Sequence, residues 1–451
     1  MQHQIKISKT MEKIPIYLVL CTLGFCSVGQ GTAFITKSNV LGYSQLIRQW
    51  ENMPGHHVIH FTDAVTGRKN YIGITDIFNY STYVQVTDNG TIHDVAVLDD
   101  VAYFCGETAT GKVLLGWVSL SDLYGSGTTA SLYVDTNMFV GSPSGIYSLE
   151  NIEVYYDASN LPRIVGYGKC SSGYVAIEYI IASIIINTWG FLPYVPYDMT
   201  LTDQFIVFAG ILPSNDLVLH PFKKSVTLDI GYAPYYSYTV GSATAVEPYS
   251  HMRIVAIGHD SVSTVAYRLD GGVYGMTLRT FDVTNAFVTN QLPMLASYQS
   301  VFPYRFDAIK DFRYNAAQRV YTVLQNYEVA LSDYHDVVTR IDFSSGIPPI
   351  VQSDYLTIAD QKMMSMSLSD SSRYVVYGYD VWSMASVFWK DFVIVSGTGP
   401  CLNTAILPYN GAASSPFNLH AEYYNNGTIN RMGPVPNTAN KIWESITTVC
   451  H

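Results

Sequence analysis

Short apolar runs separated by turn residues cover most of the chain, and long helical patterns are not evident. The clearest unit extends over residues 94–118, where three apolar runs alternate with turns. Asp99-Asp100 forms the first of these turns and Thr110-Gly111 the second, because Asp and Gly favour turn conformations. Short strand-like runs joined by tight turns predict an antiparallel meander.

The middle run of this unit recurs along the chain as two to four apolar residues followed by glycine. The copies end about 54 residues apart on average. A sixth copy, 320–324, has Leu324 in place of glycine. The five copies that end in glycine are 101–106, 164–168, 206–210, 254–258 and 374–378.

A repeat of this length that holds about four strands is typical of a β-propeller. In this architectural sense the chain resembles β-propeller repeat proteins, although no Trp-Asp dipeptide, kelch glycine pattern or Ser-x-Asp-x-Gly box links it to one family. The resemblance implies an all-β propeller of six or seven blades in a single domain over 30–451. It also implies that the two terminal segments share a closing blade. The irregular spacing leaves tandem β-sandwiches as an alternative.

One apolar segment fits the repeat poorly. Tyr179 to Ile186 is almost continuously apolar, and 189–197 continues it with two prolines. We expect a buried strand here. The alternative is an exposed hydrophobic loop that docks a partner.

The first 29 residues have the pattern of a signal peptide. A basic start with Lys6, Lys9 and Lys13 precedes an apolar stretch over 14–28, and the small residues Ser27 and Gly29 favour cleavage before Gln30. Either Met1 or Met11 is the initiator. We therefore expect a protein that is secreted, or retained at the cell surface or in the periplasm.

The same stretch is too short for a good transmembrane span, so the mature chain is expected to have none. A lipid anchor is an alternative, because Cys21 and Cys26 lie inside the stretch. Bulky Leu20 and Phe25 directly precede these cysteines and argue against it.

Charge excludes one class of partner. Removal of residues 1–29, with three lysines and one glutamate, changes the formal net charge from −11 to −13. Nucleic-acid binding relies on cationic side chains that neutralise phosphates, so no nucleic acid is expected.

Four cysteines remain after cleavage: Cys105, Cys170, Cys401 and Cys450. In an exported chain they permit two disulfides, and three pairings are open. We favour Cys401–Cys450, which would fix the C-terminus, together with Cys105–Cys170. The alternative is four buried free thiols.

Candidate chemistry is sparse. His56, His57 and His60 form the densest histidine cluster, but His56 and His60 are too far apart on a strand to share one metal ion. Close acidic pairs are better explained as turn residues. No metal site or cofactor is predicted. The acidic pairs are Asp99-Asp100, Asp307 with Asp311, and Asp333 with Asp336.

The richest aromatic region lies near the last glycine copy. Because aromatic side chains stack on sugars and anchor protein interfaces, we expect Tyr377, Tyr379, Trp382 and Trp389 to bind a ligand.

No sequence motif of a known catalytic site was found. The leading hypothesis is therefore an exported, non-enzymatic protein that recognises a glycan or a protein through one propeller face. One alternative is a polysaccharide-acting enzyme, a glycoside hydrolase or lyase, with carboxylates converging at the axis. Another is a structural subunit of a secreted assembly that associates through residues 179–197.

Overall fold

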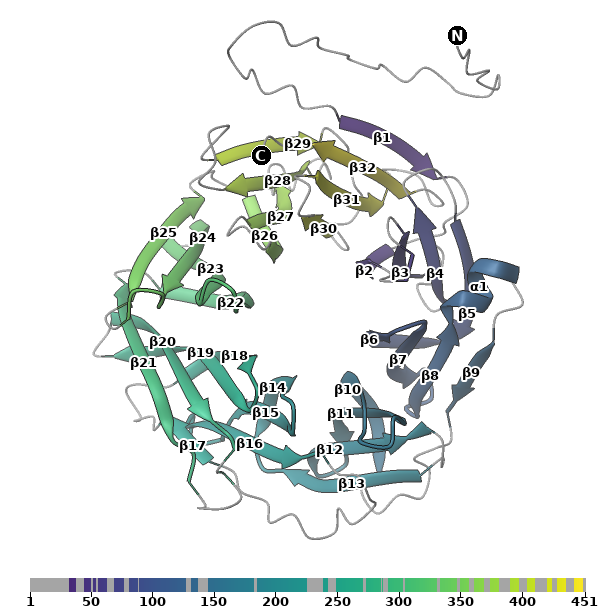
Figure 1. Ribbon diagram of the computed structural model, residues 1–451, viewed down its shortest axis with the longest axis horizontal. Helices are drawn as coiled ribbons and strands as arrows, with labels where there is room; N and C mark the ends of the chain where they lie inside the picture. The colour runs from purple at the N-terminus through teal and green to yellow at the C-terminus, as the bar shows by residue number, and fades with distance from the viewer. Residues whose placement is uncertain are drawn as a thin grey trace, which may run out of the picture.

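Antiparallel sheets arranged around one axis make up the protein (Figure 1). The computed structural model describes residues 32–448 apart from connecting segments, the longest being 137–144, 225–237, 381–389 and 410–419, and it describes side chains mainly between residues 52 and 353. The described residues contain 32 strands in eight four-stranded sheets, or blades. In each blade the first strand lies nearest the axis (Figure 1).

The first four blades each use four consecutive strands. Blade 1 contains β2 (Ser44–Gln49), β3 (His56–Thr62), β4 (Asn70–Asp76) and β5 (Ser81–Thr87). Blade 2 contains β6 (Gly90–Leu98), β7 (Val101–Thr108), β8 (Val113–Ser119) and β9 (Leu132–Asp135). Blade 3 contains β10 (Ile146–Tyr156), β11 (Pro162–Cys170), β12 (Gly173–Ile180) and β13 (Ile185–Leu192). Blade 4 contains β14 (Val195–Leu201), β15 (Phe205–Ile211), β16 (Leu217–Lys223) and β17 (Tyr238–Gly241).

The next three blades repeat this arrangement. Blade 5 contains β18 (Tyr249–Gly258), β19 (Ser261–Asp270), β20 (Val273–Asp282) and β21 (Met294–Phe302). Blade 6 contains β22 (Arg305–Asn315), β23 (Val320–Ala330), β24 (Asp333–Asp342) and β25 (Ile350–Leu356). Blade 7 contains β26 (Gln361–Leu368), β27 (Tyr374–Asp380), β28 (Lys390–Ser396) and β29 (Thr404–Tyr409).

Blade 8 combines strands from opposite ends of the chain. It contains β30 (His420–Tyr423), β31 (Thr428–Pro434), β32 (Ile442–Thr448) and, as its outer strand, β1 (Thr32–Lys37). β1 pairs antiparallel with β32, so that Thr32 lies opposite Thr447 and Lys37 opposite Ile442. The backbone hydrogen bonds of this pair join the two ends of the described chain.

The predicted all-β propeller is confirmed, and a ring of single sheets replaces the alternative of tandem sandwiches. The eight blades exceed the six or seven expected. Blade 1 was missed because its second strand, β3, lacks the terminal glycine. The copy over 254–258 was misplaced, since it belongs to the first strand β18, and the second strand of that blade is β19.

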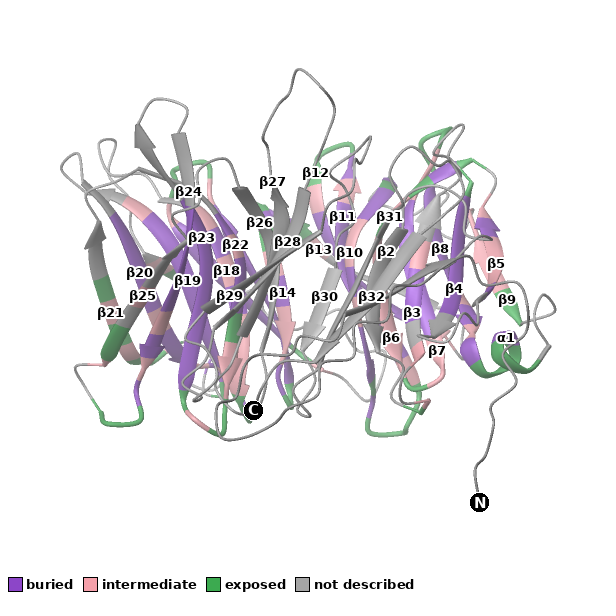
Figure 2. Cartoon of the chain, turned by 90° about the horizontal axis from the view of Figure 1, so that it is seen from above, coloured by how far each residue is buried: buried purple, intermediate pink, exposed green. Residues whose placement is uncertain are grey.

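Apolar side chains meet between neighbouring blades and form the core. Cys105 and Leu115 of blade 2 pack against Leu149 and Val175 of blade 3. Equivalent clusters join the blades from 1 to 6. Buried residues lie mainly within the strands, while exposed residues lie in turns at the two ends and along outer strands such as β21 (Figure 2). Each blade therefore depends on its neighbours to bury its faces.

The recurrent glycine has a local cause. Gly106 of β7 pairs with Ile92 of β6, directly before the register of the pair shifts by one residue. A Cβ atom at Gly106 would overlap the carbonyl oxygen of Thr91. Gly210 lies beside the corresponding shift in blade 4. The glycine thus accommodates a β-bulge in the first strand.

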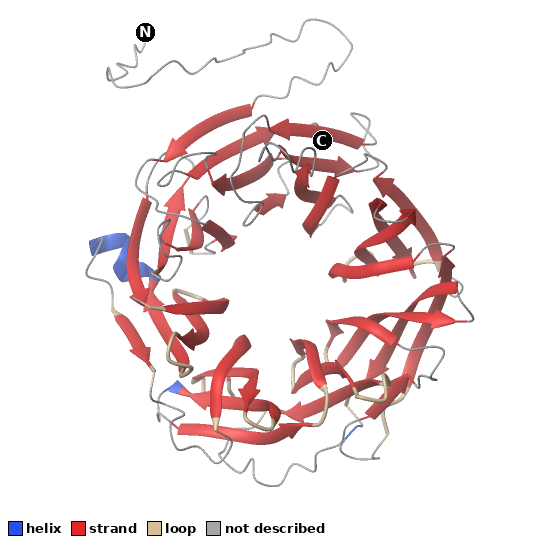
Figure 3. Ribbon diagram, turned by 180° about the vertical axis from the view of Figure 1, so that it is seen from behind, coloured by secondary structure: helices blue, strands red, loops and turns tan. Residues whose placement is uncertain are grey.

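Helix contributes little to the described residues (Figure 3). The short α1 (Leu120–Ser126) follows β8 and buries Leu120 and Leu123 among apolar residues of blades 1 and 2. Within the described part of the chain, no helix has the length and apolar character needed to cross a membrane.

Candidate functional site

The first strands of blades 1 to 7 each contain at least one β-bulge near their start. Because these strands all begin at the same end of the propeller, their extra residues lie around the axis at that end, which we call the bulge face. Six of these residues combine a described side chain with proton-transfer or charged chemistry. One is Tyr147, at a second bulge of blade 3. The other five, one from each of blades 2 to 6, we call the bulge ring: His93, Glu150, Tyr197, His251 and Lys310.

Blades 2 and 3 bring together an acid and two basic groups in the bulge ring. Glu150 Oε1 lies 3.1 Å from Lys169 Nζ and 4.0 Å from His93 Nε2. It also accepts a hydrogen bond of 2.7 Å from the Ser148 hydroxyl. Burial opposes ionisation of Glu150, but the bonds from Ser148 and Lys169 outweigh it and lower its pKa. The hydrogen bond to Glu150 raises the pKa of Lys169, which therefore stays cationic.

Blades 4 and 5 place two aromatic proton-transfer groups side by side. The rings of Tyr197 and His251 have centroids 6.3 Å apart and stand nearly perpendicular, at 75°. His251 has φ of 52°, a left-handed conformation that a bulge imposes and that a non-glycine residue adopts at a cost. In blade 6, Lys310 Nζ donates to buried Asp336 Oδ1 at 2.8 Å.

Aspartates directly after two bulges hold adjacent blades together. Asp94 accepts the backbone N–H of Val95 at 2.9 Å and, across the blade boundary, that of Ile152 at 3.0 Å. Asp198 repeats this arrangement with Met199 at 3.0 Å and Ile254 at 3.1 Å. We call each of these aspartates, with its two backbone N–H donors, a clasp. Each clasp fixes the position of one first strand along the propeller axis relative to the next first strand. The clasps thereby place His93 beside Glu150 and Tyr197 beside His251.

Desolvation raises the pKa of both clasping aspartates, and that of Asp198 to about 6. The two backbone N–H donors partly offset this desolvation, since they favour the carboxylate. Each carboxylate uses both oxygens within the protein. We therefore assign Asp94 and Asp198 to structure.

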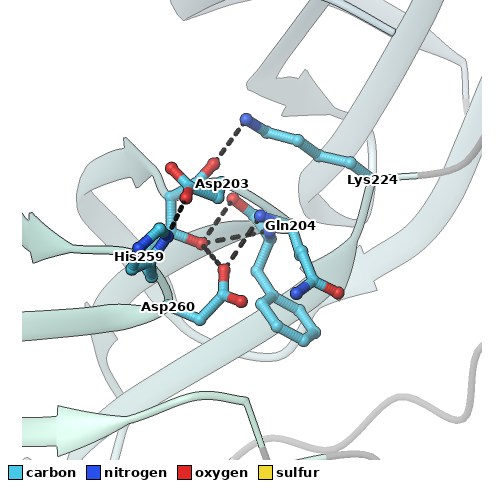
Figure 4. Close-up of polar contacts among 7 residues, drawn as sticks. Asp203, Gln204, Lys224, His259 and Asp260 are labelled. Carbon is cyan, nitrogen blue, oxygen red and sulfur yellow. Dashed lines mark hydrogen bonds and ion pairs between the residues drawn. The ribbon is translucent and has the colours of Figure 1, made fainter. Parts of the chain in front are cut away.

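The opposite face carries a second polar cluster, formed by turns of blades 4 and 5 (Figure 4). Asp260 Oδ1 accepts hydrogen bonds from the Thr202 hydroxyl and the Gln204 N–H, both at 2.9 Å. His259 Nδ1 lies 2.5 Å from Asp203 Oδ2, and the Asp203 N–H donates to the His259 carbonyl. These side chains connect two turns, so their contacts are largely structural.

A buried ionic cluster lies inside blade 3. Arg163 lies 2.7 Å from Asp157 and 3.3 Å from Glu178. The Tyr155 hydroxyl donates to Glu178 at 2.8 Å. All four residues are buried, so a ligand in solution cannot reach this cluster without rearrangement of the blade. We regard it as part of the blade core.

The predicted ligand residues lie in blade 7. Tyr377 and Tyr379 belong to β27, where they pair with Ser365 and Lys362 on the first strand. Trp382 and Trp389 lie outside the described residues. The ligand role of these four aromatics stays a prediction.

The expected Cys105–Cys170 disulfide is absent, because both thiols are buried and free. Their sulfurs instead lie within hydrogen-bonding distance of the carbonyl oxygens of Leu149 and Gly173, respectively. Cys401 and Cys450 lie outside the described residues, so their pairing stays a prediction.

The histidine and acidic candidates serve local structure where their side chains are described. His60 shares a 3.0 Å hydrogen bond with Asn70. Asp99 and Asp100 accept hydrogen bonds from Tyr156 and Asn52, both at 2.7 Å. Among the described residues, no group of three His, Cys, Asp or Glu side chains is placed to hold a metal ion.

Sequence reasoning missed the bulge ring. Its members are about 50 residues apart and have no common residue type, so no motif joins them. A usable signal is a polar residue followed by Asp or Asn, about a dozen residues before the second-strand repeat. It occurs at His93-Asp94, Glu150-Asn151, Tyr197-Asp198 and Lys310-Asp311.

No protein-family model matches the sequence, and no curated protein matches it. Solved structures with a similar fold include an oligogalacturonate lyase in complex with manganese, at 10% identity and a TM-score of 0.47 over 95% of this chain and 99% of that chain. The polysaccharide lyase Uly1 gives 10% identity and a TM-score of 0.48 over 90% of each chain. Kluyveromyces lactis Hsv2 gives 8% identity and a TM-score of 0.44 over 83% of this chain and 98% of that chain.

Proposed function

We propose that the protein binds an anionic polysaccharide at the bulge face and cleaves it by β-elimination. One observation carries the proposal. The Tyr197–His251 pair, two groups able to transfer protons, lies across a blade boundary in the same ring as His93 and Glu150, and Glu150 pairs with Lys169. Export, which the signal-peptide pattern predicts, would bring such a protein into contact with polysaccharides outside the cell.

Elimination from a uronic-acid polymer needs a base, an acid and a cation. The base removes the proton from C5, next to the carboxylate. The electrons of that C–H bond form a double bond between C4 and C5, while the bond from C4 to the glycosidic oxygen breaks. The acid then protonates the departing oxygen. A cation near the carboxylate makes the C5 proton easier to remove, because it stabilises the charge that develops there.

The bulge ring, together with Lys169 that pairs with Glu150, offers one group for each role. The imidazole of His251 serves as the base, and the hydroxyl of Tyr197 as the acid. The Lys169 ammonium supplies positive charge for the substrate carboxylate, and Glu150 holds this ammonium in place. The Asp94 clasp fixes blade 2 against blade 3, and the Asp198 clasp fixes blade 4 against blade 5.

Hydrolysis fits the described side chains less well. A glycoside hydrolase needs two carboxyl groups roughly 5 to 10 Å apart across the substrate. Glu150 is the one bulge carboxylate whose side chain is described. Asp94 and Asp198 directly follow bulges, but in each of them both carboxylate oxygens accept hydrogen bonds from backbone N–H groups.

The test incubates the purified protein with polygalacturonate, alginate and chondroitin sulfate. Elimination produces an unsaturated sugar, seen by ultraviolet absorbance, and fragments whose masses contain no added water. We expect such products from at least one polymer, and expect His251→Ala to abolish them. Fragments that carry added water would indicate hydrolysis and overturn the elimination step.

Recognition without turnover is the second candidate. It is favoured by exposed aromatic side chains on the bulge face, among them Tyr147 of blade 3. In the same incubation, retention of a polymer without any fragment would support this candidate and refute the enzyme.

A further inference from the structure

The recurrent glycine is replaced by larger polar residues in two neighbouring blades. The glycine lies on the second strand, opposite the residue that directly precedes the bulge-ring residue of the first strand. In blades 2, 3 and 4 this position holds Gly106, Gly168 and Gly210. The strand register places Tyr267 there in blade 5 and Gln325, one residue beyond Leu324, in blade 6. A departure from an otherwise regular pattern is typical of a functional or strained site.

The two replacing side chains bind each other across the boundary between blades 5 and 6. The Tyr267 hydroxyl donates a hydrogen bond of 2.7 Å to Gln325 Oε1. The Gln325 amide donates to the Thr339 hydroxyl at 3.1 Å, and this hydroxyl lies 3.2 Å from that of Ser353. Tyr267, Gln325 and Thr339 are almost completely buried. A buried polar network of paired groups holds its members in one arrangement, so blade 6 fixes the Tyr267 ring.

The Tyr267 ring connects this network to the candidate base. Its centroid lies 6.5 Å from that of His251, and the two ring planes stand at 72°. Tyr197 contacts His251 in nearly the same geometry, at 6.3 Å and 75°. Edge-to-face contacts of this length are attractive. The His251 imidazole therefore packs against one tyrosine of blade 4 and one of its own blade, and the second of these is anchored in blade 6.

We propose that Tyr267 and Gln325 are positioning residues that hold the His251 imidazole against Tyr197 in the orientation needed for proton removal. The proposal rests on the proposed function, because it takes His251 as the base. The extra residue of a bulge is left unpaired in the sheet, so side-chain contacts have to fix its direction. A misplacement of about 1 Å in a reacting group lowers a rate about 10²-fold, which gives such an anchor its value.

A second buried tyrosine in the same interface offers a matched comparison. Tyr321 of β23 is 4% exposed, and its hydroxyl shares a hydrogen bond of 2.7 Å with the Ser263 hydroxyl of blade 5. Like the bond of Tyr267, this bond crosses the boundary between blades 5 and 6. The Tyr321 ring packs against Phe312 and Tyr314 of β22. Loss of the Tyr321 hydroxyl therefore weakens the same interface at a different ring.

The experiment compares Tyr267→Phe with Tyr321→Phe in the full-length protein. Each change removes one buried hydroxyl and keeps the ring, so we expect similar decreases in the denaturation midpoint. Steady-state kinetics use polygalacturonate, alginate or chondroitin sulfate, whichever the wild type cleaves. We expect Tyr267→Phe to lower kcat about tenfold with KM unchanged, and Tyr321→Phe to change neither. Gln325→Leu removes the same bond from the side of blade 6 and should match Tyr267→Phe.

A measurement without substrate keeps this proposal separate from the proposed function. In protein labelled with ¹³C at histidine, the ring signal of His251 is assigned by its loss in His251→Ala. Its chemical shift reports the orientation of the imidazole, because nearby aromatic rings displace the resonance. We expect Tyr267→Phe and Gln325→Leu to move this signal, and Tyr321→Phe to leave it in place.

An unmoved His251 signal in both Tyr267→Phe and Gln325→Leu would overturn the positioning role. Equal losses of kcat in Tyr267→Phe and Tyr321→Phe would also overturn it, because packing alone would then explain both. A signal that moves as expected, in a protein whose wild type releases no product, would support the anchor and refute the elimination. Unsaturated products whose rate is the same in wild type and Tyr267→Phe would support the elimination and refute the positioning.

Discussion

The two ends of the propeller use similar residues for different purposes. On the face opposite the bulges, Asp203, His259 and Asp260 join neighbouring turns, and Asp260 Oδ1 accepts hydrogen bonds from both Thr202 and Gln204 (Figure 4). On the bulge face, Tyr197 and His251 contact each other across a blade boundary.

The difference arises from the backbone. A turn places Asp and His beside N–H and C=O groups that their side chains readily bind. A bulge adds one residue to a strand and re-aims its side chain, here toward the axis or the neighbouring blade. Residue type alone therefore does not separate structural from chemical groups in this protein, whereas the position relative to a bulge does.

Removal of His251 should have the largest effect. Loss of a general base typically slows a reaction about 10² to 10⁴-fold. We expect a decrease of this size in the rate of product formation for His251→Ala. His259→Ala, a histidine with a side chain 95% exposed on the opposite face, should leave the rate unchanged. Equal losses of rate in His251→Ala and His259→Ala would contradict the assignment of the reaction to the bulge face.

Gly106→Ala tests the bulge itself. The added Cβ would overlap the backbone oxygen of Thr91, which cannot move without disturbing β6. We expect the free energy of unfolding to fall by about 3 kcal/mol, as in other overpacked sites. Gly125→Ala, with open space around the position, should change stability by less than about 1 kcal/mol. Chemical denaturation of both variants measures the difference.

Burial of the Asp198 carboxyl should make stability depend on pH. Burial raises the pKa of this carboxyl from 3.8 to about 6, so its contribution is fully present below about pH 4 and is lost as the pH rises through 6. A shift of this size corresponds to about 2 to 3 kcal/mol. Relative to Asp198→Asn, the wild type should lose that much unfolding free energy between pH 4 and pH 7.5. Parallel pH profiles for the two proteins would contradict a pKa of Asp198 raised by burial.

Glu150→Gln should have the smallest effect on stability. Its bonds with Lys169 and His93 are partly exposed, so their loss should cost less than about 1 kcal/mol. The catalytic effect should be larger, with KM raised because Lys169 is no longer held. Asp203→Asn also replaces a carboxyl by an amide, in the Asp203–His259 pair on the opposite face, and should leave KM unaltered. Steady-state kinetics of Glu150→Gln and Asp203→Asn measure KM for one variant on each face.

Part of this architecture could be read from the sequence. The runs over 101–106, 164–168 and 206–210 predicted second strands correctly, because buried strands with a glycine beside a bulge leave a visible pattern. β19 escaped notice because it buries Ser263 and Thr264, whose hydroxyls bond within the protein. A buried polar strand carries no apolar signal.

The candidate site could not be read in the same way. His93 and Glu150 lie close together because of the strand register and the order of the blades. The hydrophobicity of the local sequence predicts neither the register nor the blade order. The segment over 179–197 agrees in part with each of its two predictions, the buried strand and the exposed hydrophobic loop. Tyr179 and Ile180 are buried as expected, whereas Phe191 and Val195 are exposed.

The central claim is that the bulge face holds the reacting polysaccharide. The most direct test is a crystal structure of His251→Ala with a bound oligosaccharide from whichever polymer the wild type cleaves. The account predicts a glycosidic bond beside Tyr197 and the position of His251. A sugar bound only at the opposite face, or only over the aromatic region around Tyr377, would contradict it.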